Sequence, residues 1–384
     1  MTTRWGLVLV IWAAGLGAGA QYGKVSVVYH LMRDLYPQAG HWLGFSVSMV
    51  GVLGMLFGIV TGAVVAALGY RRVLVWCLAL GACVSGVQAL DLSFGLFLLS
   101  RAVEGVSHLG LVVAAPTLIA QLSAERDRGL TLTLWGTFFG VVLTVLTWLG
   151  VPLAERHGVT ALFAAHAGAM AVLAVVLAWA LRAEPPQPRS AMPRLRDLPA
   201  LHVETYRSPY ISAPAVGWLF YTICFLAIFT VIPPYIAADQ RAVVLTAMPI
   251  TAIAVSLTLG VALLRHLQAV VVVQIGFGLC ALATLALWIW PGAVLSCLAL
   301  AGALGVVQGA SFAAVPQLNA SAPDRARANG GLAQAGNIGN TLGTPLMGLV
   351  LAGFGYGGMM ALALILFLIG LAAHQLLANR RRTR

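Results

Sequence analysis

Long apolar stretches separated by short polar breaks run through the whole chain. A helix that crosses a bilayer needs about 20 mostly apolar residues. The pattern therefore predicts an all-α integral membrane protein with twelve transmembrane helices. We expect these helices at residues 5–32, 42–68, 72–90, 95–121, 129–151, 159–181, 212–237, 242–264, 268–290, 293–319, 329–352 and 355–378.

One break is much longer than the others. It runs from Arg182 to Pro209, contains six prolines and carries much of the charge outside the apolar stretches. The two sides of this break also resemble each other, since a shift of 200 residues pairs Gly105 with Gly305 and Pro116 with Pro316. Parallel six-helix repeats around a central site are a transporter architecture. We expect an N-terminal six-helix bundle at 1–182, a cytoplasmic linker at 183–210 and a C-terminal six-helix bundle at 211–384.

Composition and charge fit this picture. Hydrophobic residues make up 60% of the chain and charged residues only 9%, whereas a soluble domain carries roughly 25% charged residues. With both termini in the cytoplasm, 17 arginines fall on that side and only three on the other, namely Arg33, Arg156 and Arg241. The positive-inside rule therefore explains the formal charge of +11 without a nucleic-acid partner. We expect a multi-pass protein of the bacterial cytoplasmic (inner) membrane.

The five cysteines lie in apolar stretches without a C-x-x-C motif or a nearby histidine at ligand spacing. This pattern favours reduced, structural thiols and predicts no metal or other cofactor.

Two short motifs connect the chain to a known family. The loop after the second stretch keeps Gly62, Gly69 and the basic pair Arg71-Arg72 of a G-x-x-x-D-R-x-G-R-R pattern, with Ala66 and Ala67 in place of the acid and the first arginine. The fourth stretch begins Arg101-x-x-x-Gly105. Over essentially its whole length the chain resembles the major facilitator superfamily. The resemblance implies a monomeric secondary transporter rather than an enzyme, in which helices one, four, seven and ten line a central cavity.

Few charges remain at membrane depth: Lys24, Arg101 and Glu104, with His108 one turn beyond Glu104. A charge at the bilayer centre costs roughly 2.5–3.5 kcal/mol on insertion scales, so these residues are functional candidates. We expect Lys24 and Arg101 to bind an anion, and Glu104 and His108 to carry the coupled proton. The structural alternatives are a neutralising Arg101–Glu104 pair, a Lys24 that reaches the outer interface, and a His108 bonded to a backbone carbonyl.

The second half offers neutral hydrogen-bonding groups at the matching depth, of which some also serve helix packing in any bundle. The candidate substrate-binding set combines these groups with polar residues of the first helix and the two basic residues: Gln21, Tyr22, Lys24, Arg101, Tyr221, Gln308, Asn337 and Asn340.

The predicted function is secondary active transport of a small organic anion, such as a carboxylate, by alternating access and proton-coupled symport. The absence of the helix-five motif of drug/proton antiporters from residues 135–152 argues against the alternative, a proton-coupled antiporter that exports a drug or metabolite. Uniport or exchange without protons, and a membrane enzyme or sensor, are further alternatives. The expected partners are the anionic substrate, protons and the lipid bilayer.

Overall fold

A computed structural model describes residues 2–182 and 190–383, which form helices and no strand. The first half begins with a long helix and a short helical cap, and each later apolar stretch forms one span. Its elements are α1 (Trp5–Ser26), α2 (Tyr29–Leu35), η1 (Pro37–Gly44), α3 (Phe45–Leu68), α4 (Tyr70–Gln88), α5 (Phe94–Leu122), η2 (Glu125–Asp127), α6 (Arg128–Gly136), α7 (Phe138–Val145), the π-helical η3 (Leu146–Gly150), α8 (Val151–His157) and α9 (Val159–Ala180).

The second half repeats this order after a short linker helix. Its elements are η4 (Leu195–Asp197), α10 (Leu198–Arg207), α11 (Ser212–Val231), η5 (Pro233–Tyr235), α12 (Arg241–Val255), the π-helical η6 (Ser256–Gly260), α13 (Val261–His266), α14 (Ala269–Ile289), α15 (Val294–Leu318) and α16 (Ala322–Arg382).

Eleven helical stretches in the described ranges are long and apolar enough to cross a membrane. The last of them, α16, has 61 residues, about 90 Å at 1.5 Å per residue, and it is broken at Gly355. Gly355 has φ 65° and ψ −167°, a conformation that an L-residue rarely adopts, so the helical path turns there. The two arms of α16 therefore account for two spans, which agrees with the expected twelve.

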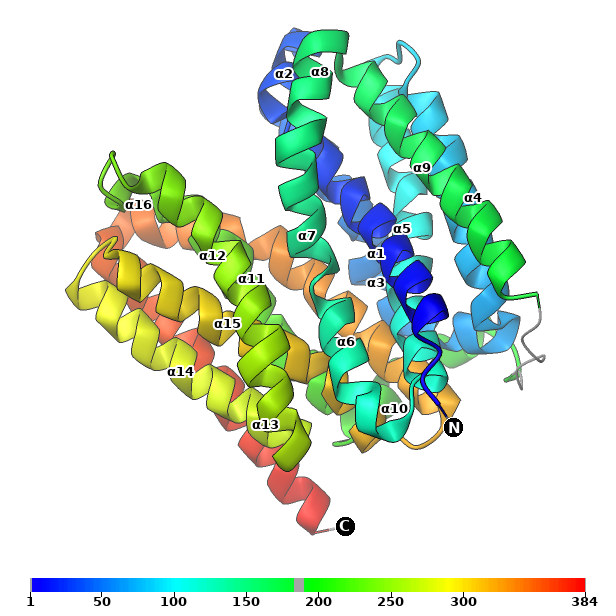
Figure 1. The fold of residues 1–384 in the computed structure, drawn as a ribbon, viewed down its shortest axis with the longest axis vertical. Coiled ribbons are helices and arrows are strands. Elements are labelled where there is room, and N and C mark those ends of the chain that lie inside the picture. Colours follow the sequence, from blue (N-terminus) through cyan, green and yellow to red (C-terminus); the bar gives the residue numbers. More distant parts are fainter. Residues whose placement is uncertain (1, 183–189, 384) are drawn as a thin grey trace.

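The two termini lie at the same end of the molecule (Figure 1). The backbone N–H of Arg4 bonds to Leu122 O at 3.0 Å, and Arg381 Nη1 donates to Pro209 O at 2.7 Å. We call this end the terminal end. The warm-coloured and cool-coloured helices lie together near it and separate towards the end that carries α2 and α8 (Figure 1).

Close packing between α3 and α16 joins the two halves near the terminal end. A Cβ added to Gly58 would meet Gln334 N at 2.7 Å, and one added to Gly330 would meet Ile59 Cα at 3.2 Å. Next to Gly330, Asn329 Nδ2 donates to Thr117 Oγ1 of α5 at 2.8 Å. Glycine at these positions permits the two helix backbones to approach closely.

The linker region also contributes to this contact. Tyr206 on α10 donates its hydroxyl to Gln334 Oε1 at 2.8 Å, and Gln334 Nε2 donates to Met55 O at 2.8 Å. Burial raises the pKa of the Tyr206 hydroxyl, which keeps it protonated and able to donate. The linker helix is thereby bonded through one glutamine to both halves. The division of the chain at residues 183–210 stays a prediction, and residues 183–189 lie outside the described ranges.

Candidate functional site

A cavity of about 100 Å³ lies between the two halves. Residues of α1, α5, α6, α7, α11, α15 and α16 line it. Six of the residues that the sequence singled out for the site are among them: Tyr22, His108, Tyr221, Gln308, Asn337 and Asn340.

Aromatic rings form much of the wall. Trp218 stacks on Tyr221 with centroids 4.6 Å apart, and Phe312 meets Trp218 edge-on at 5.0 Å. Stacked and edge-on rings hold one another in fixed orientations, because their quadrupoles favour these arrangements. The cavity therefore has a rigid aromatic side that would pack against an apolar or planar part of a solute.

Polar bridges cross the cavity from one half to the other. Tyr22 donates to Asn337 Oδ1 at 2.7 Å, and Gln308 Nε2 donates to Gly136 O at 2.6 Å. These bonds tie α1 to α16 and α15 to α6, so a solute that displaces them would change how the halves meet.

Two donors on lining residues remain without a partner in the described ranges. They are the hydroxyl of Tyr221 and the indole N–H of Trp135, both on side chains no more than 2% exposed. Buried donors are nearly always hydrogen-bonded. Both donor atoms are themselves shielded from the open part of the cavity in this conformation.

His108 is the one histidine among the described residues that line the cavity. Its Nδ1 lies 2.9 Å from Ala18 O, and its ring meets Tyr22 edge-on at 5.0 Å. The carbonyl can only accept, so Nδ1 carries the hydrogen and Nε2 of the neutral ring is left as an acceptor. The backbone bond that was the structural alternative is present, and it leaves the second ring nitrogen available for a proton.

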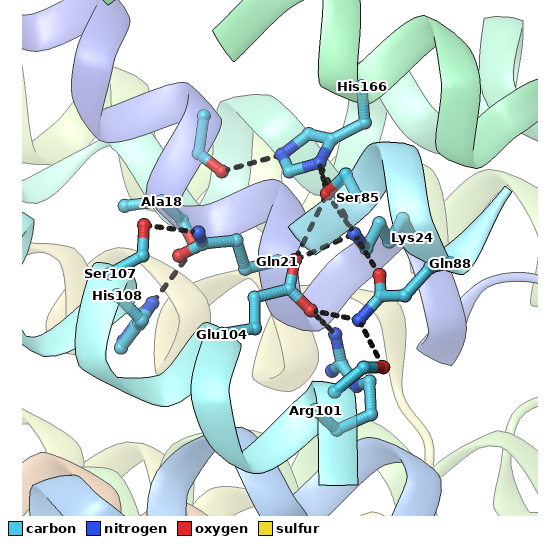
Figure 2. Close-up of polar contacts among 12 residues, drawn as sticks. Ala18, Gln21, Lys24, Ser85, Gln88, Arg101, Glu104, Ser107, His108 and His166 are labelled. Carbon is cyan, nitrogen blue, oxygen red and sulfur yellow. Dashed lines mark hydrogen bonds and ion pairs between the residues drawn. The ribbon is translucent and has the colours of Figure 1, made fainter. Parts of the chain in front are cut away.

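The deep charges gather behind this wall in one buried network (Figure 2). Lys24 Nζ donates to Glu104 Oε1 at 2.6 Å, to Ser85 Oγ at 2.6 Å and to Gln88 Oε1 at 2.7 Å. Three acceptors match the three N–H bonds of an ammonium group. Lys24 is fully buried and therefore does not reach the outer interface.

Glu104 accepts hydrogen bonds on both carboxylate oxygens. Oε1 accepts from Lys24 Nζ, and Oε2 accepts from Gln88 Nε2 at 2.9 Å and from Arg101 Nη1. Each named neighbour is a donor, so the network favours the ionised carboxylate, and a proton on Glu104 would require one neighbour to turn away.

Arg101 is fully buried and is held by two acceptors. Its Nε donates to Ser46 O at 2.7 Å and its Nη1 to Glu104, while Nη2 has no partner among the described residues. Two cations and one acid leave this network with one excess positive charge.

The structure thus separates the candidates into two groups. Lys24, Arg101, Glu104 and Gln21 are fully buried and are not among the residues that line the cavity in this conformation. Gln21 donates instead to Ser107 Oγ at 2.8 Å. The Arg101–Glu104 pair that was the structural alternative is present, and the substrate and proton roles of these four residues stay predictions.

Three members of the network were missed from the sequence: Ser85 and Gln88 on α4, and His166 on α9. His166 Nδ1 lies 2.7 Å from Ser85 Oγ, and its Nε2 lies 3.1 Å from Gly17 O (Figure 2). The carbonyl fixes the hydrogen on Nε2, so Nδ1 accepts from the Ser85 hydroxyl. A histidine in the middle of an otherwise apolar span was the available signal, because polar groups at that depth require a partner.

A helical membrane protein with two halves, a cavity between them and a buried charge network behind its wall is built as a secondary transporter is. The sequence profile of the Major Facilitator Superfamily matches residues 7–322. The chain belongs to this family, as its motifs predicted. A search of curated proteins finds no match.

Solved structures with the same fold include the human organic anion transporter MFSD10 (TETRAN). It has a TM-score of 0.77 at 18% identity, with 96% of this chain and 98% of that chain covered. The proton:xylose symporter XylE has a TM-score of 0.76 at 13% identity, with 96% of this chain and 94% of that chain covered. The E. coli fucose:proton symporter FucP has a TM-score of 0.74 at 15% identity, with 98% of this chain and 99% of that chain covered. At these identities the likeness establishes the fold alone.

Proposed function

We propose that this protein moves a small organic anion, such as a carboxylate, across the bacterial cytoplasmic membrane together with protons. The observation that carries the proposal is the excess positive charge of the Lys24–Glu104–Arg101 network directly behind the cavity wall. In a low-dielectric interior an unbalanced charge acts over a longer distance than in water, and it favours an anion in the adjacent cavity.

The lining supports the same class of solute. The amides of Asn337 and Asn340, which line the cavity, would bind carboxylate or hydroxyl oxygens. The Trp218–Tyr221 stack would pack against the carbon skeleton. An anion with an apolar part fits both kinds of wall.

Proton coupling is proposed for His108, with Glu104 as the fixed counter-charge of the network and the second candidate for protonation. A proton on His108 Nε2 would place a second positive charge at the cavity, which would strengthen anion binding, and the anion would in turn favour the proton. Such reciprocal linkage makes the two ligands cross together when the halves rock about the site.

Uptake by purified protein in liposomes tests the proposal. A panel of labelled organic anions is offered with and without an inward proton gradient, and we expect one anion whose uptake the gradient stimulates. His108→Gln should keep binding but lose the stimulation. Glu155→Gln, a change at an exposed carboxylate, is the matched control and should transport normally. Gradient-independent uptake by the unmodified protein would contradict the coupling.

Export by antiport is the second candidate, and the aromatic wall favours it. No Asp, Glu, Lys or Arg side chain lines the cavity within the described ranges, and rings from both halves surround it. Exchange or efflux of neutral or cationic aromatic compounds in the same liposomes, without uptake of any anion, would replace the symport proposal by this one.

A further inference from the structure

A second concavity, of about 1180 Å³, opens at the terminal end and lies apart from the transport cavity. Both halves contribute to its lining. Arg126 comes from η2, Arg128 from the start of α6, Arg265 from α13 and Arg381 from the end of α16. We call it the arginine cleft.

The arginine cleft carries an excess of two positive charges. Among the described residues, its lining contains these four arginines and two acids, Glu125 and Asp127. Asp127 is already engaged, since it accepts from Thr3 Oγ1 at 2.5 Å and lies 3.8 Å from Arg126 Nε. The first residues of α6 and α14 also border the cleft, and helix N-termini favour anions.

Two of the arginines are held in place by single bonds that leave their other N–H groups available. Arg128 Nε donates to Ala120 O at 3.2 Å, and Arg381 Nη1 donates to Pro209 O at 2.7 Å. The Arg265 side chain makes no hydrogen bond or ion pair within residues 2–182 and 190–383. The retention of basic residues on one side of the membrane explains why this end is positively charged. It does not require four arginines to line one concavity between the halves.

We infer that the arginine cleft binds a phosphate group. Guanidinium groups match the oxygens of a phosphate in geometry, and a phosphate monoester carries close to two negative charges near neutral pH, which equals the excess in the cleft. A phosphate that contacts Arg126 or Arg128 and also Arg265 or Arg381 bridges the two halves. Its binding therefore stabilises the arrangement in which the terminal end is closed, and so acts as an effector of transport.

The phosphate group has two possible sources, a soluble phosphorylated compound or the headgroup of an anionic lipid. In the soluble arm, the full-length protein in neutral detergent is titrated with inorganic phosphate, and its thermal unfolding midpoint is followed at constant ionic strength. In the lipid arm, the midpoint is compared between nanodiscs of phosphatidylcholine and nanodiscs that contain phosphatidic acid.

The double variant Arg126→Gln/Arg265→Gln removes one cleft arginine from each half. The matched control Arg71→Gln/Arg72→Gln removes the same charge from exposed positions outside the cleft. We expect a saturable rise in the midpoint for the unmodified protein and for the control. For the cleft variant we expect an apparent affinity for phosphate that is at least about tenfold weaker. A rise in the soluble arm assigns the site to a free phosphate, and a rise only with phosphatidic acid assigns it to a headgroup. No rise in either arm, or an equal response from the two double variants, would overturn the inference.

Discussion

At the scale of single residues, Glu104 has the strongest predicted effect on stability. Its carboxylate is the one negative charge of a network that contains two buried cations. Glu104→Gln keeps the shape but leaves Lys24 and Arg101 without a counter-charge, and removal of one partner of a buried ion pair costs about 3–5 kcal/mol. We expect a lower unfolding midpoint by differential scanning fluorimetry in detergent.

The matched control for that measurement is Glu155→Gln. Glu155 is 54% exposed and lies 3.9 Å from the exposed ring of His30, so its loss should change stability little. Equal midpoints for the two variants would mean that Glu104 does not neutralise the buried cations, and the charge count on which the anion proposal rests would have to be revised.

The same network marks the limit of prediction from sequence. Arg101, Glu104 and His108 are spaced three and four residues apart, which puts them on one face of a helix, and the structure has all three on α5. Periodicity does not say which neighbouring helix that face meets. Lys24 and Glu104 meet α4 and α9 through Ser85, Gln88 and His166, whereas His108, one turn on, reaches the cavity. Partner choice depends on the rotation and packing of helices far apart in sequence.

At the scale of helices, the spans were predictable because bilayer thickness fixes their length. Breaks inside the spans were not predictable. The fifth span is divided into α6, α7, η3 and α8, although its hydropathy is continuous. A π-helical segment changes the hydrogen-bond pattern without changing the residue type, so hydropathy carries no signal for it.

Close helix packing gives a prediction at the same scale. Gly343 on α16 faces α11, where an added Cβ would meet Ile223 Cα at 2.9 Å, too close for any real contact. Gly343→Leu should therefore lower the free energy of unfolding by about 1–3 kcal/mol. Gly348→Leu in the same helix is the control, because a Cβ there meets nothing within 4 Å. Denaturant titration of both variants measures the difference, and equal midpoints would contradict the packing.

At the scale of the whole molecule, the closed terminal end depends on glycines that come from opposite halves. A Cβ on Gly62 of α3 would meet Arg327 Cα at 3.0 Å, and one on Gly330 of α16 would meet Gly62 N at 3.2 Å. The same segment holds Ala66 and Ala67, where the family pattern has an acid and an arginine. Within the described ranges, close backbone packing joins the halves at that position, where Ala66 and Ala67 carry no charge.

Gly330→Leu should therefore open the terminal end. The added side chain cannot fit against the backbone of α3, so the closed state loses stability relative to a state in which the halves separate there. Spin labels on cysteines introduced at Arg71 and Arg325, in a background with exposed Cys83 replaced by serine, report the separation by double electron–electron resonance. We expect the distance distribution to move to longer values. Gly86→Leu, at a position with open space around it, should leave the distribution unchanged. If Gly330→Leu also left it unchanged, close packing of α3 against α16 would not be what holds this end shut, and the bonds of Gln334 with Tyr206 and Met55 would be the next candidates.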